Sequence, residues 1–302
     1  MLMVNEALAE ISGAVRFLHT AWQPVVDHIS TVNMEIHNHL DCVRRVSLKR
    51  QHDCMKATLA LADVELGETT VPFLRPAVEE YIWCEYFNLI GREKASVLVE
   101  HLLFFDMFNT MQAQAAFSGD ESIEAMGIAL QRDGFRRIEP AQREKYFELA
   151  AELKFPARAG KKAKPPPFAF IAEKVDQRRL YDFLYFATSK TVHFSTHELT
   201  RRPWGKPPLY KIKSPLFRDY WTCFSLVWSA RLFVFTMTAN EDLIIDLPDL
   251  DMEIFKKATE TIQKHRYIPI FLAQEFKWSP DMPLHEIFSG AGPLMQSKLE
   301  RR

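Results

Sequence analysis

The sequence predicts an all-α fold, a multi-helix bundle followed by an irregular C-terminal tail. Apolar residues recur at helical spacing along most of the chain. Phe is abundant, with 23 residues, whereas Gly is rare, with 10. Hydrophobic residues make up 47% of the chain, which is enough to fill a core. A bundle of roughly seven to nine helices is therefore expected.

The N-terminal third carries three segments with helical periodicity. Residues 2–18 are amphipathic, and residues 20–65 continue the pattern without Gly or Pro after Pro24. Thr70 is expected to cap the next helix, because a threonine hydroxyl can accept a hydrogen bond from a free backbone N–H of the first turn. Gly91 should end that helix.

The remaining two thirds alternate between helical segments and Pro-rich or Gly-rich breaks. The pattern predicts helices over 92–117, from Pro140 to about 153, and over 168–195, 215–239 and 249–265. From Arg266 onward Pro and Gly interrupt the periodicity. We therefore expect a single helical domain over residues 1–265 and an irregular tail over 266–302, which wraps the surface or reaches a partner.

The stretch from Trp221 to Ala239 is apolar and about long enough to span a bilayer. Arg231 lies near its middle, among serines and threonines. Because charged side chains are costly inside a bilayer, a buried core helix is the expected interpretation, with no membrane partner.

The rest of the composition indicates a cytoplasmic protein. The first residues include Glu6 and Glu10 and lack the basic start of a signal peptide. The cysteines show neither a CxxC pair nor regular spacing, so we expect buried thiols and no zinc site or other cofactor; they are Cys42, Cys54, Cys84 and Cys223.

Two segments carry positive charge and no acid, although the whole chain has a formal net charge of −1. The candidate ligand-binding cations in residues 154–167 are Lys161, Lys162 and Lys164, and those in residues 201–213 are Arg201 and Arg202. Trp204 and Tyr210 are interleaved with the second set. Basic residues mixed with aromatic ones are typical of sites for a nucleotide, RNA or single-stranded DNA.

The predicted helix that ends near residue 195 carries a polar line. Tyr181, Tyr185, Ser189 and His193 recur at every fourth position, so they should share one face, which His197 would extend. The line either borders a ligand groove or consists of buried groups bonded to neighbouring helices. In the first interpretation His193 is the candidate general base, and the ligand-binding residues are Tyr185, Ser189 and His197.

Arg75 and Glu79 lie four residues apart amid large apolar side chains. If this pair is buried, it acts as a clamp between helices, and loss of one partner is costly. In the functional interpretation Arg75 binds an anion and Glu79 orients it.

The two helices together resemble a bacterial all-helical family of unknown function. Its members share an Arg-x-x-x-Glu helix and a later Ser-x-x-x-His helix, here Arg75 with Glu79 and Ser189 with His193, inside YDFLYFATSKTVHFSTHEL. The resemblance covers roughly residues 40–200. Such proteins resemble accessory or effector proteins found beside toxin and anti-phage genes, which implies a role in bacterial defence and no particular activity.

Two further spacings suggest other chemistry. His193 and His197, followed by Glu198, have the spacing of a helical metal pair, but no third ligand is specified, so no metal is predicted. Arg45 and His52 have the Arg-x6-His spacing of helical ribonucleases in toxins and defence systems.

The leading hypothesis is a cytoplasmic binding or effector module for nucleic acid or nucleotide in anti-phage defence. The first alternative is a metal-independent ribonuclease toxin, with His193 or His52 as general acid–base and an arginine stabilising the phosphorane. The second is a protein-interaction subunit of a larger complex, whose basic segments dock an acidic partner.

Overall fold

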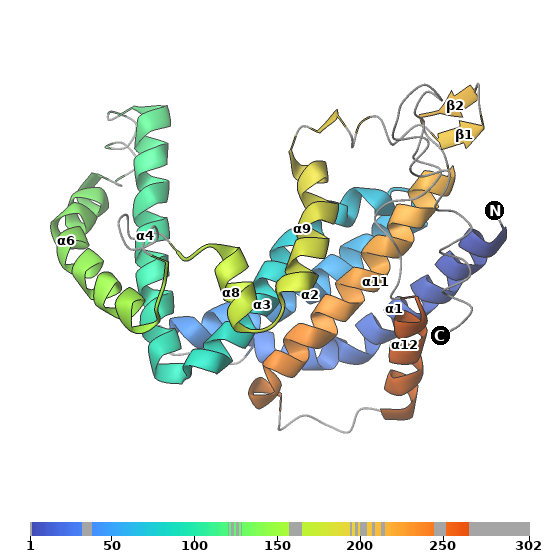
Figure 1. The fold of residues 1–302 in the computed structure, drawn as a ribbon, viewed down its shortest axis with the longest axis horizontal. Helices are drawn as coiled ribbons and strands as arrows, with labels where there is room; N and C mark the ends of the chain where they lie inside the picture. The colour runs from blue at the N-terminus through green and yellow to red at the C-terminus, as the bar shows by residue number, and fades with distance from the viewer. Residues whose placement is uncertain are drawn as a thin grey trace.

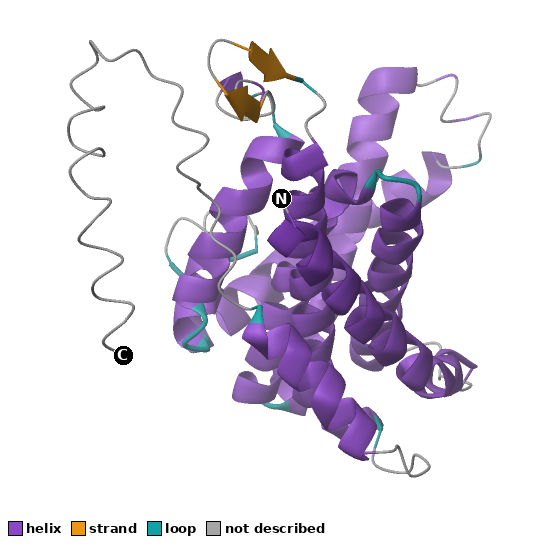
Figure 2. Cartoon of the chain, turned by 90° about the vertical axis from the view of Figure 1, so that its right-hand side faces the viewer, coloured by secondary structure: helices purple, strands orange, loops and turns teal. Residues whose placement is uncertain are grey.

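The predicted all-α fold class is confirmed by a computed structural model of the chain (Figures 1 and 2). The structure describes residues 2–31, 38–119, 121, 124, 127, 129–156, 165–193, 195, 196, 199, 204–206, 209–212, 215–244 and 252–265. The expected tail, residues 266–302, lies outside these ranges, and the boundary at residue 265 stays a prediction.

Helices account for nearly all described elements. The first half of the chain contains α1 (Leu2–Thr31), α2 (His39–Asp63), the 3₁₀ helix η1 (Gly67–Phe73), α3 (Leu74–Ile90), α4 (Arg92–Ser118) and α6 (Ala129–Glu152). The second half contains α8 (Phe168–Lys174), α9 (Arg178–Val192), the strands β1 (Trp204–Lys206) and β2 (Leu209–Lys211), α11 (Pro215–Ala239), the 3₁₀ helix η2 (Glu241–Leu243) and α12 (Met252–Lys264).

Helix α11 forms the centre of the bundle. It packs against α1, α2, η1 and α3, and every residue from Trp221 to Ala230 is buried. The segment Phe217–Ala239 is long and apolar enough to cross a membrane, but 78% of its apolar window is buried inside the protein. This is the packing expected of a core helix.

The core has two parts on either side of α11. One joins α11 to α1 and α2 through residues such as Val15, Leu48 and Phe233. The other joins it to α3, α4, α6, α8 and α9 through residues such as Ile82 and Leu184. Helices α4 and α6 pack side by side at one end of the molecule (Figure 1).

Several helix boundaries differ from those expected. Helix α1 continues through Pro24 to Thr31, because Val25, Val26 and Ile29 extend its buried face. Thr70 does not cap α3; it lies inside η1, where its hydroxyl donates to the Gly67 carbonyl at 2.7 Å.

The expected end of α3 is confirmed, whereas the expected start of a helix at Pro140 is wrong. Gly91 follows α3 with a φ of 81°, a conformation in which glycine has no steric penalty. Pro140 lies inside α6, which begins at Ala129. Pro140 is exposed, so water can reach the carbonyl that its missing N–H leaves unbonded.

The C-terminal half contains two more corrections. The helix predicted over 168–195 is divided into α8 and α9, and Asp176 between them has a φ of 56°. This left-handed residue ends α8 and reverses the chain. The segment 201–213, which lies between two predicted helices, contains an antiparallel hairpin in which Gly205 pairs with Tyr210.

Candidate anion-binding site

Helix α9 packs against α3 and η1, and this packing brings two separate sequence motifs together. Leu184, Ala187 and Thr188 form the buried face of α9. Phe183 reaches α11, where its ring centre lies 5.5 Å from that of Trp228. The neighbouring face of α9 therefore lies along the first turns of α3, where Arg75 is.

Arg75 stacks on Tyr185 at this seam. Its guanidinium carbon lies 4.7 Å from the centre of the Tyr185 ring, within the range of a cation–π contact. Its Nε lies 3.4 Å from Glu79 Oε1, at the long limit of a hydrogen bond. Among the described residues the guanidinium makes no other hydrogen bond, so its two terminal amino groups remain available to a ligand. The side chains of Arg75 and Glu79 are each 26% exposed.

A series of aromatic rings leads from Tyr185 of α9 to α3, each in contact with the next. The Tyr181 ring centre lies 5.5 Å from that of Tyr185 and 5.8 Å from that of Phe168. The Phe168 ring in turn lies 5.9 Å from Trp83 of α3. Sequence periodicity placed Tyr181 and Tyr185 on one face but did not single out Phe168 or Trp83. Such contacts hold the Tyr185 ring in place under Arg75.

Glu79 and Glu80 of α3 lie at two different contacts between helices. Burial raises the pKa of Glu79, and the charge of Arg75 partly opposes this effect. Glu80 instead turns toward α2, where its carboxylate accepts hydrogen bonds from Gln51 at 3.3 Å and pairs with Arg50 at 2.9 Å. Burial raises the pKa of Glu80 to about 7. Only Glu79 can therefore orient Arg75.

The polar line on α9 is shorter than the sequence predicted. Tyr181, Tyr185 and Ser189 are helical, but α9 ends at Val192, and His193 has an extended conformation with φ −108° and ψ 157°. The helix ends at His193, and the place of its side chain on the polar face stays a prediction. His193 is exposed, and its backbone N–H donates to the Ser189 carbonyl at 3.1 Å. Its role as a base stays a prediction.

Six other candidate residues lie outside the described residues: Lys161, Lys162, Lys164, His197, Arg201 and Arg202. Phe168 of the aromatic series follows the first basic segment directly in the sequence. Lys164 is four residues from Phe168, so their Cα atoms are at most about 14 Å apart. Within the described ranges, no group of three His, Cys, Asp or Glu side chains could hold a metal ion.

Arg45 and His52 form part of the α1–α2 seam, not a surface site. His52 is 1% exposed and its ring stacks on that of His19, with centres 4.0 Å apart. Its Nε2 lies 2.9 Å from the His19 carbonyl, and Arg45 donates to the Ile29 carbonyl at 3.1 Å. Burial lowers the pKa of His52. RNA cannot reach a buried imidazole, so His52 does not support the ribonuclease interpretation, which stays a prediction.

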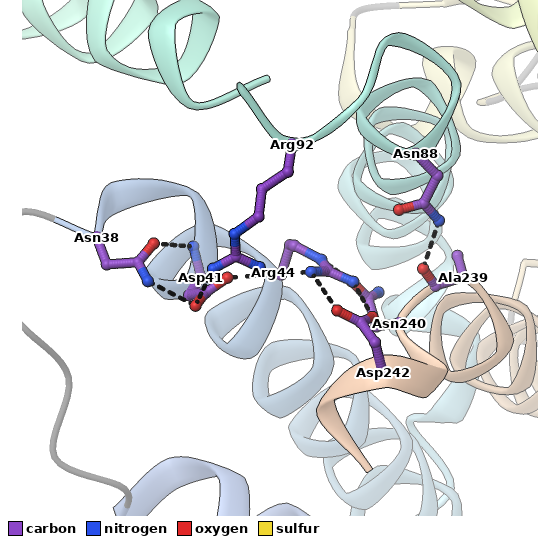
Figure 3. Close-up of polar contacts among 8 residues, drawn as sticks. All are labelled: Asn38, Asp41, Arg44, Asn88, Arg92, Ala239, Asn240 and Asp242. Carbon is purple, nitrogen blue, oxygen red and sulfur yellow. Dashed lines mark hydrogen bonds and ion pairs between the residues drawn. The ribbon is translucent and has the colours of Figure 1, made fainter. Parts of the chain in front are cut away.

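Sequence reasoning missed a second arginine cluster, centred on Arg44 (Figure 3). Arg44 Nε donates to Asn240 Oδ1 at 2.6 Å, and one terminal amino group donates to Asp242 Oδ2 at 2.9 Å. The other amino group donates to Asp242 Oδ1. Asp41 also faces Arg44 and pairs with Arg92 at 2.8 Å. Arg44 itself is only 4% exposed.

The same cluster joins α2, α3, α4, α11 and η2 (Figure 3). Asn38 caps α2 by accepting from the Asp41 N–H at 3.2 Å. Asn88, near the end of α3, donates to the Ala239 carbonyl at the end of α11 at 2.6 Å. No periodic pattern points to these polar residues, because each lies at or near a helix end. With its donors occupied, Arg44 is a structural residue.

Comparison with known proteins gives one match. A family model described as a family of unknown function, DUF5677, matches residues 45–205, which is more than half of the chain. The match contains α3, α9 and the whole seam around Arg75. No curated protein and no solved structure matches the chain.

Proposed function

The chain belongs to the family of unknown function DUF5677, and we propose that its α3–α9 seam binds an anionic ligand that carries a base: a nucleotide or a single strand of RNA or DNA. One observation supports this proposal most directly. Arg75 lies over the Tyr185 ring with one long contact to Glu79, which leaves the terminal amino groups of its guanidinium for a phosphate.

The aromatic surroundings favour a ligand with a base over a bare anion. Phe186, next to Tyr185 on α9, is 58% exposed, and its ring centre lies 6.0 Å from that of Tyr185. Exposed aromatic rings beside a cation are typical of single-strand binding, because every base can stack on them. The basic segments that precede and follow α8 and α9 would add phosphate contacts from Lys161, Lys162, Lys164, Arg201 and Arg202.

As part of this proposal, the protein acts in the cytoplasm of a bacterial cell, as a binding or effector module in anti-phage defence. The four cysteines are free, which suits a reducing compartment. The defence setting comes from the family resemblance of the Arg75 and Ser189 helices. Infection assays with and without the Arg75→Ala variant test it, and equal phage restriction by both proteins would contradict it.

The binding proposal is tested by fluorescence anisotropy with a labelled single-stranded RNA, and with unlabelled ATP as competitor. We expect Arg75→Ala to weaken RNA binding at least tenfold. The slope of log binding constant against log salt concentration should become shallower by about one, because one phosphate contact is lost. Arg75→Lys should recover part of the affinity, because lysine keeps the charge but not the planar fork. Tyr185→Phe should bind like wild type, and Tyr185→Ala should not.

Arg143→Ala is the matched control for this experiment. Arg143 pairs with Glu139 four residues away, as Arg75 pairs with Glu79, but it lies on α6. If Arg143→Ala and Arg75→Ala lower the affinity equally, the loss comes from the change in net charge, and the ligand does not bind at the α3–α9 seam. Binding of RNA by wild type and Arg75→Ala with the same affinity would refute the proposal.

The ribonuclease alternative retains one supporting observation, the exposure of His193 beyond the end of α9. Incubation of RNA with wild type and His193→Ala in EDTA tests it. We expect the RNA to remain intact with both, because a binding module does not cleave its ligand. The interaction-subunit alternative depends on the basic segments, and no described residue favours it.

A further inference from the structure

A small cleft lies between η1, the last turn of α9 and the first turns of α11. Its volume is about 170 Å³. A cavity of about 150 Å³ can hold a benzene-sized molecule, so a ligand group of a few heavy atoms fits here. The lining residues are Glu68, Thr69, Val71, Pro72, Thr191, Phe217 and Trp221. None of them belongs to the Arg75 seam.

The polar atoms of this cleft are hydrogen-bond acceptors. Glu68 Oε2 is buried, and within the described part of the chain no donor reaches it. The Thr69 hydroxyl donates its proton to the Leu66 carbonyl at 2.7 Å, and the Thr191 hydroxyl donates to the Thr188 carbonyl at 2.6 Å. Both hydroxyl oxygens therefore keep only lone pairs for a ligand.

The walls of the cleft favour positive charge as well. Phe217 and Trp221 are 7% and 2% exposed, and aromatic faces attract cations. Among the described residues, no Lys or Arg lines the cleft. Arg218, which follows Phe217 in the sequence, is already paired with Asp219 at 2.7 Å and with Glu65. A buried carboxylate oxygen without a partner is unfavourable, and a cationic donor would satisfy it.

We propose that this cleft binds the primary ammonium group of an alkylamine. Three acceptor oxygens, from Glu68, Thr69 and Thr191, match the three N–H donors of an –NH₃⁺ group. The alkyl chain then lies against the two aromatic rings. A guanidinium is planar and a quaternary ammonium has no donors, so both match the three acceptors less well. The ammonium group belongs either to a free amine or to a lysine side chain.

Calorimetric titration of the full chain with n-butylamine at pH 7 tests this proposal. At this pH the amine is protonated, since alkylammonium groups titrate near pH 10. We expect a dissociation constant on the order of 1 mM, as suits so small a ligand. Butyltrimethylammonium and 1-butanol should bind at least tenfold more weakly, because neither supplies an ammonium N–H. Equal binding of 1-butanol would overturn the proposal, since the cleft would then be a plain apolar cavity.

Glu68→Gln is the decisive variant, because it keeps the shape of the side chain and removes its charge. We expect it to weaken n-butylamine binding at least tenfold, whereas Glu173→Gln, at an exposed position of α8, should bind like wild type. In wild type, the indole NMR signal of Trp221 should shift on titration, which tests the location independently of any variant. No shift, or unchanged affinity of Glu68→Gln, would refute the site.

Nα-acetyl-lysine methylamide distinguishes the two sources of the ammonium group. Tighter binding of this compound than of n-butylamine indicates a lysine side chain, and weaker binding indicates a free amine. Loss of amine binding leaves RNA binding by Arg75 unaffected, so the two proposals fail separately.

Discussion

Arg44 and Arg75 both pair with carboxylates, but their surroundings differ. The Arg44 side chain is 5% exposed, and its guanidinium is bonded to Asn240 and Asp242. The Arg75 side chain is 26% exposed and has one long contact, to Glu79. Arg44 joins the ends of α2 and α11, whereas Arg75 lies on an aromatic ring at the α3–α9 seam.

This difference indicates which arginine has donors available to bind a ligand. A buried guanidinium is tolerated only when protein groups satisfy its donors, so nothing remains for binding. A half-exposed guanidinium on a tyrosine ring is positioned without using up its donors. The comparison therefore supports a structural role for Arg44 and the proposed ligand-binding role for Arg75, and it predicts opposite profiles of stability and binding when each is changed.

The largest expected effect is that of Arg44→Ala on stability. Removing this side chain leaves Asn240 buried with an unbonded oxygen and Asp242 without its partner. We expect the free energy of unfolding to fall by about 3–5 kcal/mol, because Arg44 loses hydrogen bonds to two partners, and each bond to a charged group contributes about 1.5–3 kcal/mol. Urea denaturation measures this change. Arg16→Ala, which breaks an exposed pair with Asp63, is the control and should cost less than about 1 kcal/mol.

A smaller loss is expected for Asn240→Ala. Asn240 is fully buried, accepts from Arg44 and donates to the Thr236 carbonyl at 2.6 Å. Its removal should lower the free energy of unfolding by about 1–3 kcal/mol, because the Arg44 Nε–H loses its acceptor. In a double-mutant cycle with Arg44→Ala the two losses should not add, since they share one bond. Strictly additive losses would show that Arg44 is not held as described.

The smallest effect is expected for Glu79→Ala. A clamp role would predict a loss of about 3–5 kcal/mol. The pair is partly exposed and has one long contact, which predicts a loss of less than about 1 kcal/mol. A larger loss in urea denaturation would restore Glu79 to the scaffold and weaken the distinction between the two arginines.

The two carboxylates should also respond to pH in opposite directions. Burial raises the pKa of Glu79 above its unfolded value of about 4.3. As pH falls from the folded pKa toward the unfolded pKa, the folded protein binds the proton first. The free-energy cost of burying the carboxylate charge is then relieved, and the protein gains stability. The hydrogen bonds from Arg44 lower the pKa of Asp242, so its stabilising contribution is present above about pH 3.9 and is lost as pH falls through the folded pKa. Carboxyl NMR titration of both groups measures the two signs, and Glu79→Gln should abolish only the first.

Part of the site could be predicted because it depends on local spacing. Residues four apart on a helix share a face, so Arg75 with Glu79 and Tyr181 with Tyr185 were grouped correctly. The same rule did not show that α9 ends at Val192 and that the chain becomes extended at His193. Helical spacing also could not show whether Arg45 and His52 lie on the surface. In the structure His52 is buried in the α1–α2 seam.

The sequence by itself determined the helical class, the end of α3 at Gly91 and the apolar character of α11, because each depends on the periodicity or conformation of nearby residues. Only the tertiary structure decided that Arg75 meets Tyr185, or that Arg44 meets Asn240, 196 positions away. Helical periodicity shows which face of a helix is apolar. Many helices have such a face, and the choice between them is made by the shapes that pack together in the core.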